Sequence, residues 1–378
     1  MTDVLIYADT FRSPELRHEV PLGVPDPFLY AEKDGTKHIV IGSMEIPRLR
    51  EIGGFELHPG EEFGADELVA RGLSYFEIRE QIVVRAVQAL GTTSAFVPET
   101  FPLRMADLLR AVGVELTPNR DFFDARRRSK VPAELAGIRR AQRAAEAGMA
   151  AARDLLRRAV PNGAGLVVDG EPLTVELVKA AIGQAFVANG STTDDCIVAR
   201  GAQAAVGHDM GSGQIQSGET VVIDVWPRDA ESFCFADMTR TFVVGEIAAD
   251  VAEWHRLCKE ALDRAISEVK PGAIGHAIFD GSCDIFEAAG EPTQRTKQPG
   301  VPLADGFFHG LGHGVGLEVH EEPGLGLTST TALQVGDVVT VEPGLYRQGY
   351  GGVRLEDLVL VTEDGAENLT RFPYDLTP

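Results

Sequence analysis

The stretch Phe307–Glu322 reads FFHGLGHGVGLEVHEE and places three of the nine histidines of the chain, His309, His313 and His320, in a glycine-rich segment. This concentration of imidazoles indicates a polar site. Acidic residues before and after the segment could complete a metal cage, namely Asp224, Asp237, Glu342 and Glu356.

The length, composition and net charge of the chain limit its class. A chain of 378 residues is too long for one core of ordinary size and favours two or three domains. A content of 44% hydrophobic and 24% charged residues is typical of a soluble globular protein. The formal net charge of −22 opposes binding to nucleic acid or to an anionic membrane, because long-range repulsion acts against both encounters.

The N-terminus and the cysteines predict a cellular compartment. The start MTDVLIYADTF lacks the basic residues and the long apolar run of a signal peptide. No apolar stretch approaches the roughly 18 residues of a membrane span. The four cysteines are scattered, without a CxxC pair, so reduced thiols are expected rather than disulfides. We therefore expect a cytoplasmic protein.

The first part of the chain predicts a compact α/β unit. Apolar runs at residues 4–7, 28–32 and 38–41 predict strands, and Asp34-Gly35 between the last two is a hairpin signal. Apolar residues at helical spacing from Phe76 to Leu90 predict a following helix. Strands interleaved with helices in this way form an α/β layer structure.

A domain boundary is predicted near residue 130. The basic segment Arg126–Lys130, RRRSK, runs into Pro132 and a long amphipathic pattern, and proline in a first turn is a helix-start signal. We interpret RRRSK as a solvated linker rather than a binding patch. The predicted domains are residues 1–130 and 131–378.

The second part of the chain contains every candidate ligand. Its periodicity predicts helices at residues 132–159, 174–189, 248–269 and 274–289. Strands are predicted at residues 196–199, 220–226, 235–244, 337–341 and 353–361.

Two aspartates interrupt strand-like segments in this part. Asp224 stands among β-branched residues, where an unpaired buried carboxylate costs several kcal/mol, so a cation is expected beside it. The alternative is an edge strand with Asp224 in water. Asp237 lies after a predicted hairpin loop that returns the second strand beside the first. Thr239 and Thr241 share its face, so a polar surface strand is the alternative there.

Two glutamates and an arginine follow the histidine segment. Glu342 ends the apolar strand DVVTVE before Pro343-Gly344. Arg354 and Glu356 are two residues apart and share a face of a predicted strand. Taken alone, such a pair is more often a cross-strand salt bridge than a site.

Together, one imidazole and four carboxylates contain enough donors for two divalent ions. Without metal, four negative charges in one cleft would repel each other. The donor set suits Mn²⁺, Co²⁺, Zn²⁺ or Fe²⁺ rather than an ion selected by thiolates, and the donors do not choose among the four. We expect Mn²⁺ first, with the other three as alternatives. These candidate ligands are Asp224, Asp237, His313, Glu342 and Glu356.

The ordered set IDVW, ADMTRTF, HGLGHGVGLEVHE, VEPGLY and GGVRLED resembles the pita-bread metallopeptidase family (M24), which includes methionine aminopeptidase, Xaa-Pro aminopeptidase and Xaa-Pro dipeptidase (prolidase). The resemblance covers the chain from about residue 130 to its end and implies an α+β pita-bread catalytic domain. The preceding residues are similar in size and position to the α/β N-terminal domain of the creatinase and prolidase branch. A homodimer is implied by analogy with that domain.

The resemblance also implies roles for individual residues. Asp224 would chelate one ion, Asp237 and Glu356 would bridge two ions, and His313 and Glu342 would complete the other. Roles in orienting substrate or stabilising a tetrahedral intermediate are implied for His208, His309, His320 and Arg354.

The implied activity is hydrolysis of the Xaa-Pro bond at the N-terminus of a peptide with proline in second place. A hydroxide bridging two ions would attack the peptide carbonyl, with Glu342 as the carboxylate that takes a proton. His309 or His320 would stabilise the oxyanion. The proline specificity rests on the resemblance alone.

Two departures from the family pattern affect this interpretation. The separation of Asp224 and Asp237 is longer than the resemblance leads us to expect, so WPRDAESFCF is predicted to carry a bulge or a longer turn. Many related dipeptidases have an arginine shortly after the HE pair, where this chain has Gly324. This difference favours an Xaa-Pro aminopeptidase, with an Xaa-Pro dipeptidase as the alternative.

Other chemistry is also compatible with such a fold. A metal-free creatinase-like mechanism is disfavoured, because that type of enzyme does not retain all five ligands. A metal-assisted lyase and a non-catalytic scaffold are further alternatives.

Overall fold

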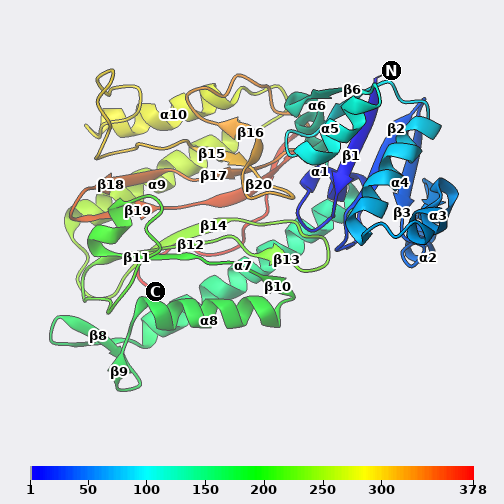
Figure 1. Ribbon diagram of the computed structural model, residues 1–378. Helices are drawn as coiled ribbons and strands as arrows, with labels where there is room; N and C mark the ends of the chain where they lie inside the picture. Colours follow the sequence, from blue (N-terminus) through cyan, green and yellow to red (C-terminus); the bar gives the residue numbers. More distant parts are fainter. Residues whose placement is uncertain (1) are drawn as a thin grey trace. The chain divides into compact units, whose positions relative to one another are not determined.

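The computed structural model describes residues 2–378 and divides into two compact units. The N-terminal unit ends at Arg127 and the C-terminal unit begins at Arg128 (Figure 1). Across residues 2–378, no helix combines the length and the apolar character needed to cross a membrane.

The N-terminal unit is built on a six-stranded sheet of order β4-β3-β2-β1-β5-β6. The hairpin predicted at Asp34-Gly35 is confirmed: it joins β2 to β3, and its two residues adopt φ values of 49° and 83°, as a tight hairpin turn requires. The strands are β1 (Asp3–Ala8), β2 (Phe28–Lys33), β3 (Thr36–Ile41), β4 (Glu56–Pro59), β5 (Ser94–Val97) and β6 (Glu115–Pro118).

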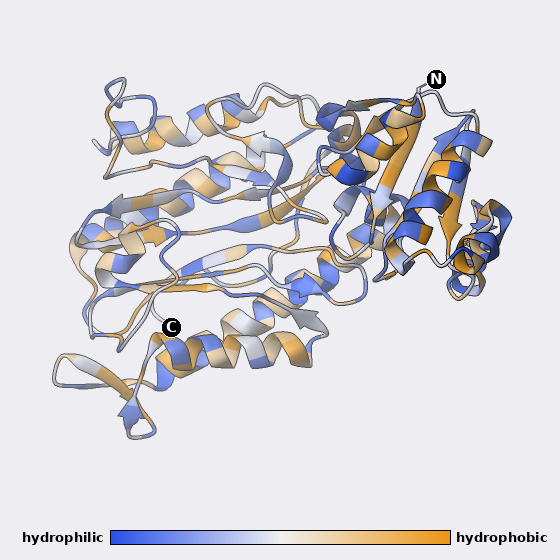
Figure 2. Cartoon of the chain, in the orientation of Figure 1, coloured by the Kyte–Doolittle hydropathy of each residue, from blue (hydrophilic) through white to orange (hydrophobic). Residues whose placement is uncertain are grey.

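Helices pack on both faces of this sheet and form two separate hydrophobic clusters with it. Figure 2 shows largely hydrophobic strands and helices of mixed hydropathy, the pattern expected when a sheet is covered on both faces. Helix α4 begins with a capping box between Ser74 and Glu77. The helices are α1 (Pro14–Glu19), α2 (Ile46–Ile52), η1 (Gly60–Phe63), α3 (Ala65–Ala70), α4 (Tyr75–Ala89), α5 (Leu103–Ala111) and α6 (Arg120–Arg128).

The interpretation of RRRSK as a solvated linker was wrong. Most of the segment is the last turn of α6, and its charges are paired. Arg126 bonds to Glu32 at 2.6 Å, and Arg128 bonds to Asp337 at 2.6 Å. Lys130, with 3% of its side chain exposed, pairs with Glu321. Buried charges require such partners, so these side chains stabilise the fold locally.

The C-terminal unit contains the four helices predicted from periodicity, and their positions are confirmed to within one residue: α7 (Pro132–Arg158), α8 (Val175–Ala188), α9 (Ala249–Glu268) and α10 (Gly275–Ala288). Helix α7 packs on α8, and α9 packs on α10; Figure 1 shows each pair side by side. One hydrophobic cluster lies under each pair.

Small sheets lie between these helix pairs. The orders are β11-β12-β14, β16-β15-β17-β20-β21 and β18-β19, with β7-β8-β9 and β10-β13 as short additions. The first sheets comprise β11 (Ile197–Arg200), β12 (Thr220–Val225), β14 (Met238–Val243), β15 (Gly312–Gly314), β16 (Glu321–Leu325), β17 (Val338–Val341), β18 (Gly344–Arg347), β19 (Gly351–Arg354), β20 (Asp357–Thr362) and β21 (Gly365–Asn368). The short elements are β7 (Val160–Asn162), β8 (Gly165–Val168), β9 (Glu171–Pro172), β10 (Ser191–Thr192), η2 (Gly201–Ala205) and β13 (Arg228–Asp229).

The strand predicted at residues 353–361 is two strands. β19 pairs with β18, whereas β20 pairs with β17 and β21. The chain changes sheets at Leu355-Glu356, where Glu356 N bonds to the carbonyl of Thr239. Periodicity alone could not reveal the change, because the apolar pattern continues through it.

The contact between α7 and α8 leads to a stability prediction. A Cβ at Gly148 would lie 2.4 Å from Phe186 Cε1, whereas a Cβ at Gly183 would meet nothing within 4 Å. Gly148→Ala should therefore lower the free energy of unfolding by about 1–3 kcal/mol through overpacking. Gly183→Ala should leave it unchanged or raise it by up to about 1 kcal/mol, because alanine is the better helix former. Urea denaturation followed by circular dichroism compares the two, and equal effects would contradict the packing argument.

Candidate metal centre

A cavity of about 820 Å³ in the C-terminal unit is lined by all nine predicted site residues. They come from strands, strand ends and loops of three sheets. The nine are His208, Asp224, Asp237, His309, His313, His320, Glu342, Arg354 and Glu356.

Asp224 lies on a central strand, so the alternative of an edge strand in water was wrong. β12 lies between β11 and β14, and Asp224 faces Ile197 on one side and Thr239 on the other. The cation expected beside it is Arg354, whose Nη2 donates to Asp224 Oδ2 at 2.5 Å. The other oxygen, Oδ1, is buried and receives no hydrogen bond from the described residues.

Asp237 stands directly before β14, and the alternative of a polar surface strand was also wrong. Thr239 and Thr241 are 0% and 1% exposed. Thr239 Oγ1 donates to Glu356 Oε2 at 2.7 Å, which orients that carboxylate toward the cavity. Like Asp224, Asp237 has a buried Oδ1 that receives no hydrogen bond from the described residues.

The long connection between the two aspartates is anchored on α7. Asp229 accepts two bonds of 2.8 Å from Arg140 and also caps Ser232. Within this connection Phe233 adopts a positive φ of 69°, and the longer turn relative to the family stays a prediction. A Cβ at Gly137 would lie 1.9 Å from Ser232 Oγ, so the absence of a side chain on α7 makes room for the turn.

His313, on β15, lies among the carboxylates. Its Nε2 is 3.6 Å from Glu342 Oε1 and 3.8 Å from Asp237 Oδ2. Its Nδ1 contacts the carbonyl of Gly314 at 3.1 Å, the kind of outer contact that leaves Nε2 available to a metal. One ligand atom each from Asp237, His313 and Glu356 lie within 4.8 Å of one another.

The electrostatics of the cavity suit a cation. Burial, reinforced by the neighbouring carboxylates, raises the pKa values of Asp237 and Glu356 well above their usual range. Burial also raises the pKa of Glu342 to about 8, although Arg354 opposes this shift. Burial lowers the pKa of His313 to about 4, so its imidazole is neutral at pH 7 and able to act as a ligand. Oxygen-rich donors with one imidazole fit divalent ions.

Tyr346 is a site residue that our reading of the sequence missed. Its hydroxyl accepts from Arg354 Nη1 at 3.1 Å and therefore donates to His309 Nε2 at 2.8 Å. Nδ1 of His309 must then carry the proton that it donates to the carbonyl of Gly310, at 2.7 Å. Both ring nitrogens of His309 are thus engaged within the protein. The signal was the tyrosine of VEPGLY, which stands just after Glu342.

His320 differs from His309 in its contacts. Its ring packs against that of His313 at 4.2 Å between centroids. It lines the cavity, and burial lowers its pKa against the opposing effect of Asp224 and Glu318. His320 is therefore available to bind a ligand of the cavity.

The remaining wall of the cavity is mostly apolar, which the sequence reading also missed. It includes Ile197, Val206, Met210, Trp226, Phe308 and Val319. Gly324, on β16, is absent from the described lining, and a Cβ there would lie 2.9 Å from Ser329 Oγ. Arg354 is thus the one lysine or arginine side chain in the described lining, and it is paired with Asp224.

Comparison with known proteins identifies the family. Residues 136–363 match the sequence profile of metallopeptidase family M24. A relative from Mycobacterium bovis, named as a probable dipeptidase PepE, is 31% identical over 297 residues, which cover 78% of this chain and 72% of the relative. The chain belongs to metallopeptidase family M24.

A second M24 relative is more similar over a shorter region. The Xaa-Pro dipeptidase of Pyrococcus furiosus is 37% identical over 183 residues, which cover 48% of this chain and 49% of the relative. The match therefore spans about half the length of that curated relative.

Solved structures confirm the pita-bread α+β fold of this M24 chain. The prolidase from Pyrococcus furiosus superposes with a TM-score of 0.76 at 25% identity, covering 99% of this chain and 97% of that one. An X-Pro aminopeptidase from Thermotoga maritima has a TM-score of 0.79 at 21% identity and covers 99% of this chain and 97% of that one, a likeness of fold.

Because the carboxylates of the cavity lie close together, replacing one of them should affect thermal stability differently without metal and with metal. Asp237→Asn replaces a carboxylate whose ionisation is opposed by burial and by its acidic neighbours, so the metal-free variant should be at least as stable as the metal-free wild type. Addition of Mn²⁺ should raise the melting temperature of the wild type and leave that of the variant nearly unchanged. Differential scanning calorimetry after chelation measures both.

A buried carboxylate outside the cavity provides the control. Asp357 is 0% exposed and pairs with Arg240 at 2.9 Å. Asp357→Asn should lower the melting temperature both with and without Mn²⁺, because it leaves a buried arginine without its charged partner. If Asp237→Asn behaved in the same way, the carboxylates would not be a cation site.

Proposed function

We propose that this M24 chain is a metal-dependent exopeptidase that hydrolyses the Xaa-Pro bond at the N-terminus of peptides. The observation that carries the proposal is one cavity that gathers four carboxylates, a neutral His313 and an available His320. A cluster of buried carboxylates without matching cations is costly, so its presence favours a function over a structural role.

The residues proposed to hold metal are the five ligands predicted from the sequence. Asp237, His313 and Glu356 supply the most closely grouped donor atoms, and Asp224 and Glu342 line the same cavity. We propose two divalent ions, Mn²⁺ first and Co²⁺, Zn²⁺ or Fe²⁺ as alternatives. Bound there, they would supply Lewis-acid activation of water and of the peptide carbonyl.

The protein groups divide the remaining work. Glu342 is proposed to take the proton of the attacking water. His320 is proposed to donate a hydrogen bond to the developing oxyanion, because it lines the cavity and its ring packs against that of His313. His309 is instead proposed to be a positioning residue, because Tyr346 and Gly310 hold both of its ring nitrogens. His208 and Arg354, which line the cavity, complete the proposed substrate-facing set.

The apolar wall supports a proline in second place. Trp226, Phe308 and Met210 offer hydrophobic and aromatic surface to a pyrrolidine ring. Proline also lacks the amide hydrogen that other residues would bring into this wall, so it leaves no unsatisfied donor there.

The charges of the cavity favour an aminopeptidase over a dipeptidase. An Xaa-Pro dipeptide brings a carboxylate on the proline, and Arg354 is already paired with Asp224. Position 324, a glycine, supplies no cation. The second candidate is an Xaa-Pro dipeptidase, favoured by the name of the Pyrococcus furiosus relative.

The creatinase-like N-terminal domain, the homodimer and the cytoplasmic location stay predictions.

The two candidates make different predictions about substrate length. With Mn²⁺ or Co²⁺ present, kcat/KM should be higher for Xaa-Pro-Yaa than for Xaa-Pro, because the longer peptide places no carboxylate beside the acidic ligands. Release of the N-terminal residue measures both rates. A preference for the dipeptide would support the dipeptidase, and inactivity of the wild type equal to that of Asp237→Ala with each metal would overturn the hydrolase proposal.

The two histidines on either side of His313 should differ in kinetic effect. His320→Gln should lower kcat by about 10²–10³-fold with little change in KM, as expected for loss of an oxyanion donor. His309→Gln should lower kcat less, because the ring is a positioning group. Steady-state kinetics on one Xaa-Pro-Yaa peptide compares them, and the reverse order would assign the donor role to His309.

A further inference from the structure

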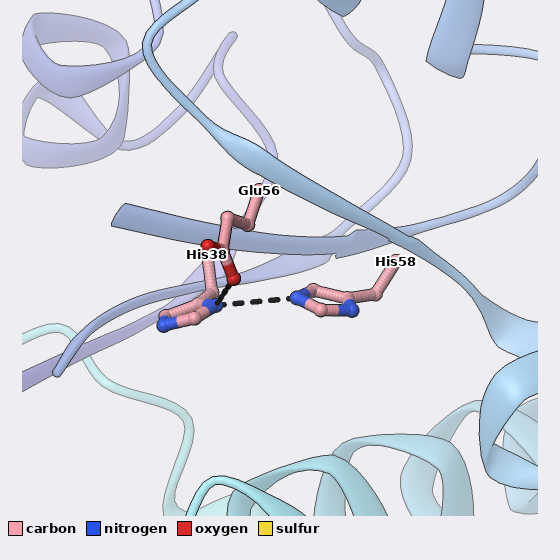
Figure 3. Close-up of side chains that lie close together, drawn as sticks. All are labelled: His38, Glu56 and His58. Atoms are coloured by element: carbon pink, nitrogen blue, oxygen red, sulfur yellow. Dashed lines mark hydrogen bonds and ion pairs between the residues drawn. The ribbon is translucent and has the colours of Figure 1, made fainter. Parts of the chain in front are cut away.

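A second group of metal-ligand side chains lies in the N-terminal unit, on β3 and the edge strand β4. The strands are parallel, with His38 opposite Glu56 and Val40 opposite His58. Residues two apart on a strand share a face, so His38, Glu56 and His58 project from the same side. Figure 3 shows the three side chains converging, with both imidazoles edge to edge and the carboxylate above them.

The two distances from His38 Nδ1 to the other ligand atoms match the edges of a metal tetrahedron. His38 Nδ1 is 3.2 Å from His58 Nε2 and 3.3 Å from Glu56 Oε2 (Figure 3). For Zn–N bonds of about 2.0–2.1 Å, ligand atoms in a tetrahedral site are separated by about 3.3–3.4 Å. All three ligand atoms lie within 4.8 Å of one another.

An outer carboxylate completes the arrangement. His58 Nδ1 lies 2.9 Å from Glu62 Oε2, so that nitrogen carries the proton and Nε2 presents its lone pair to the other two ligands. A carboxylate behind a ligating histidine is the usual means of fixing the tautomer at zinc sites. Glu62 is on η1, directly after β4.

Hydrogen bonds alone account poorly for this geometry. His38 Nδ1 carries at most one proton, yet it faces two acceptors at 3.2 and 3.3 Å, both at or beyond the long end of the hydrogen-bond range. His38 is 8% exposed, so its imidazole is withdrawn from solvent.

We propose that His38, Glu56 and His58 form a binding site for one divalent transition-metal ion, with Zn²⁺ as the best match. Two imidazoles and one carboxylate are a zinc-type donor set, and no thiolate or oxygen cage is present among the three. Water would occupy the fourth coordination position of the ion. The Glu56 side chain is 62% exposed, so one side of the group is accessible to solvent.

The bound ion is a structural clamp on the edge of the sheet. β4 pairs with β3 alone and has only four residues, so few backbone bonds hold it. Ligands from both strands join them through the metal. The site thus depends on neither the cavity of the C-terminal unit nor the proposed peptidase activity.

The test measures the number of zinc ions bound per full-length chain. Wild type and His58→Gln are stripped with chelator, dialysed against Zn²⁺ and analysed by inductively coupled plasma mass spectrometry. The variant should bind one equivalent less. Glu62→Gln should keep the equivalent but bind it about 10–100-fold more weakly. The matched control is His276→Gln, which removes a histidine paired with Asp280 at 3.2 Å beside Arg295, and it should not change the count.

A local measurement separates this site from the C-terminal cavity. In hydrogen–deuterium exchange, Zn²⁺ should slow exchange at residues 56–58 in the wild type and in His276→Gln. It should not do so in Glu56→Gln. Because the Glu56 side chain is exposed, this substitution should not disturb folding. Equal zinc content in wild type and His58→Gln, or exchange at residues 56–58 that does not respond to Zn²⁺, would overturn the proposal.

Discussion

Four carboxylates held in one buried cavity repel one another, and the C-terminal unit is organised to keep them there. Asp224, Asp237, Glu342 and Glu356 lie on or beside different strands, so none can withdraw without disturbing a sheet. Part of the repulsion is offset within the protein: Arg354 bonds to Asp224, and Thr239 donates to Glu356. The charge that these contacts leave uncompensated favours a cation in the cavity.

The same constraint explains features that look unrelated to chemistry. The chain changes sheets between β19 and β20, which brings Arg354 at the end of β19 and Glu356 in the link to the same cavity. The long hairpin after Asp224 is anchored on α7 through Arg140 and Asp229, so its extra length does not displace Asp237. Packing therefore holds the carboxylates in place through residues that touch none of them.

The two histidines and the glutamate on β3 and β4 of the N-terminal unit are brought together by the pairing of two strands. His38 and His58 belong to neighbouring parallel strands, and their approach depends on the register of β3 and β4. Twenty residues of chain separate them, without a recognised ligand spacing. The cavity of the C-terminal unit is a concentration of negative charge, whereas the group on β3 and β4 is two imidazoles and one carboxylate in a partly exposed position.

The sequence by itself determined the helices of the C-terminal unit, the hairpin at Asp34-Gly35 and the set of nine polar residues, because periodicity, turn chemistry and motif order are local properties. It could not separate a buried Asp224 from an exposed one, since that depends on which strand lies at the sheet edge. Nor could it place the charges of RRRSK, which pair with residues distant in sequence, or the hydroxyl of Tyr346, which contacts both Arg354 and His309. Only the tertiary structure decided these points, because burial and pairing arise from contacts between segments that local patterns do not relate.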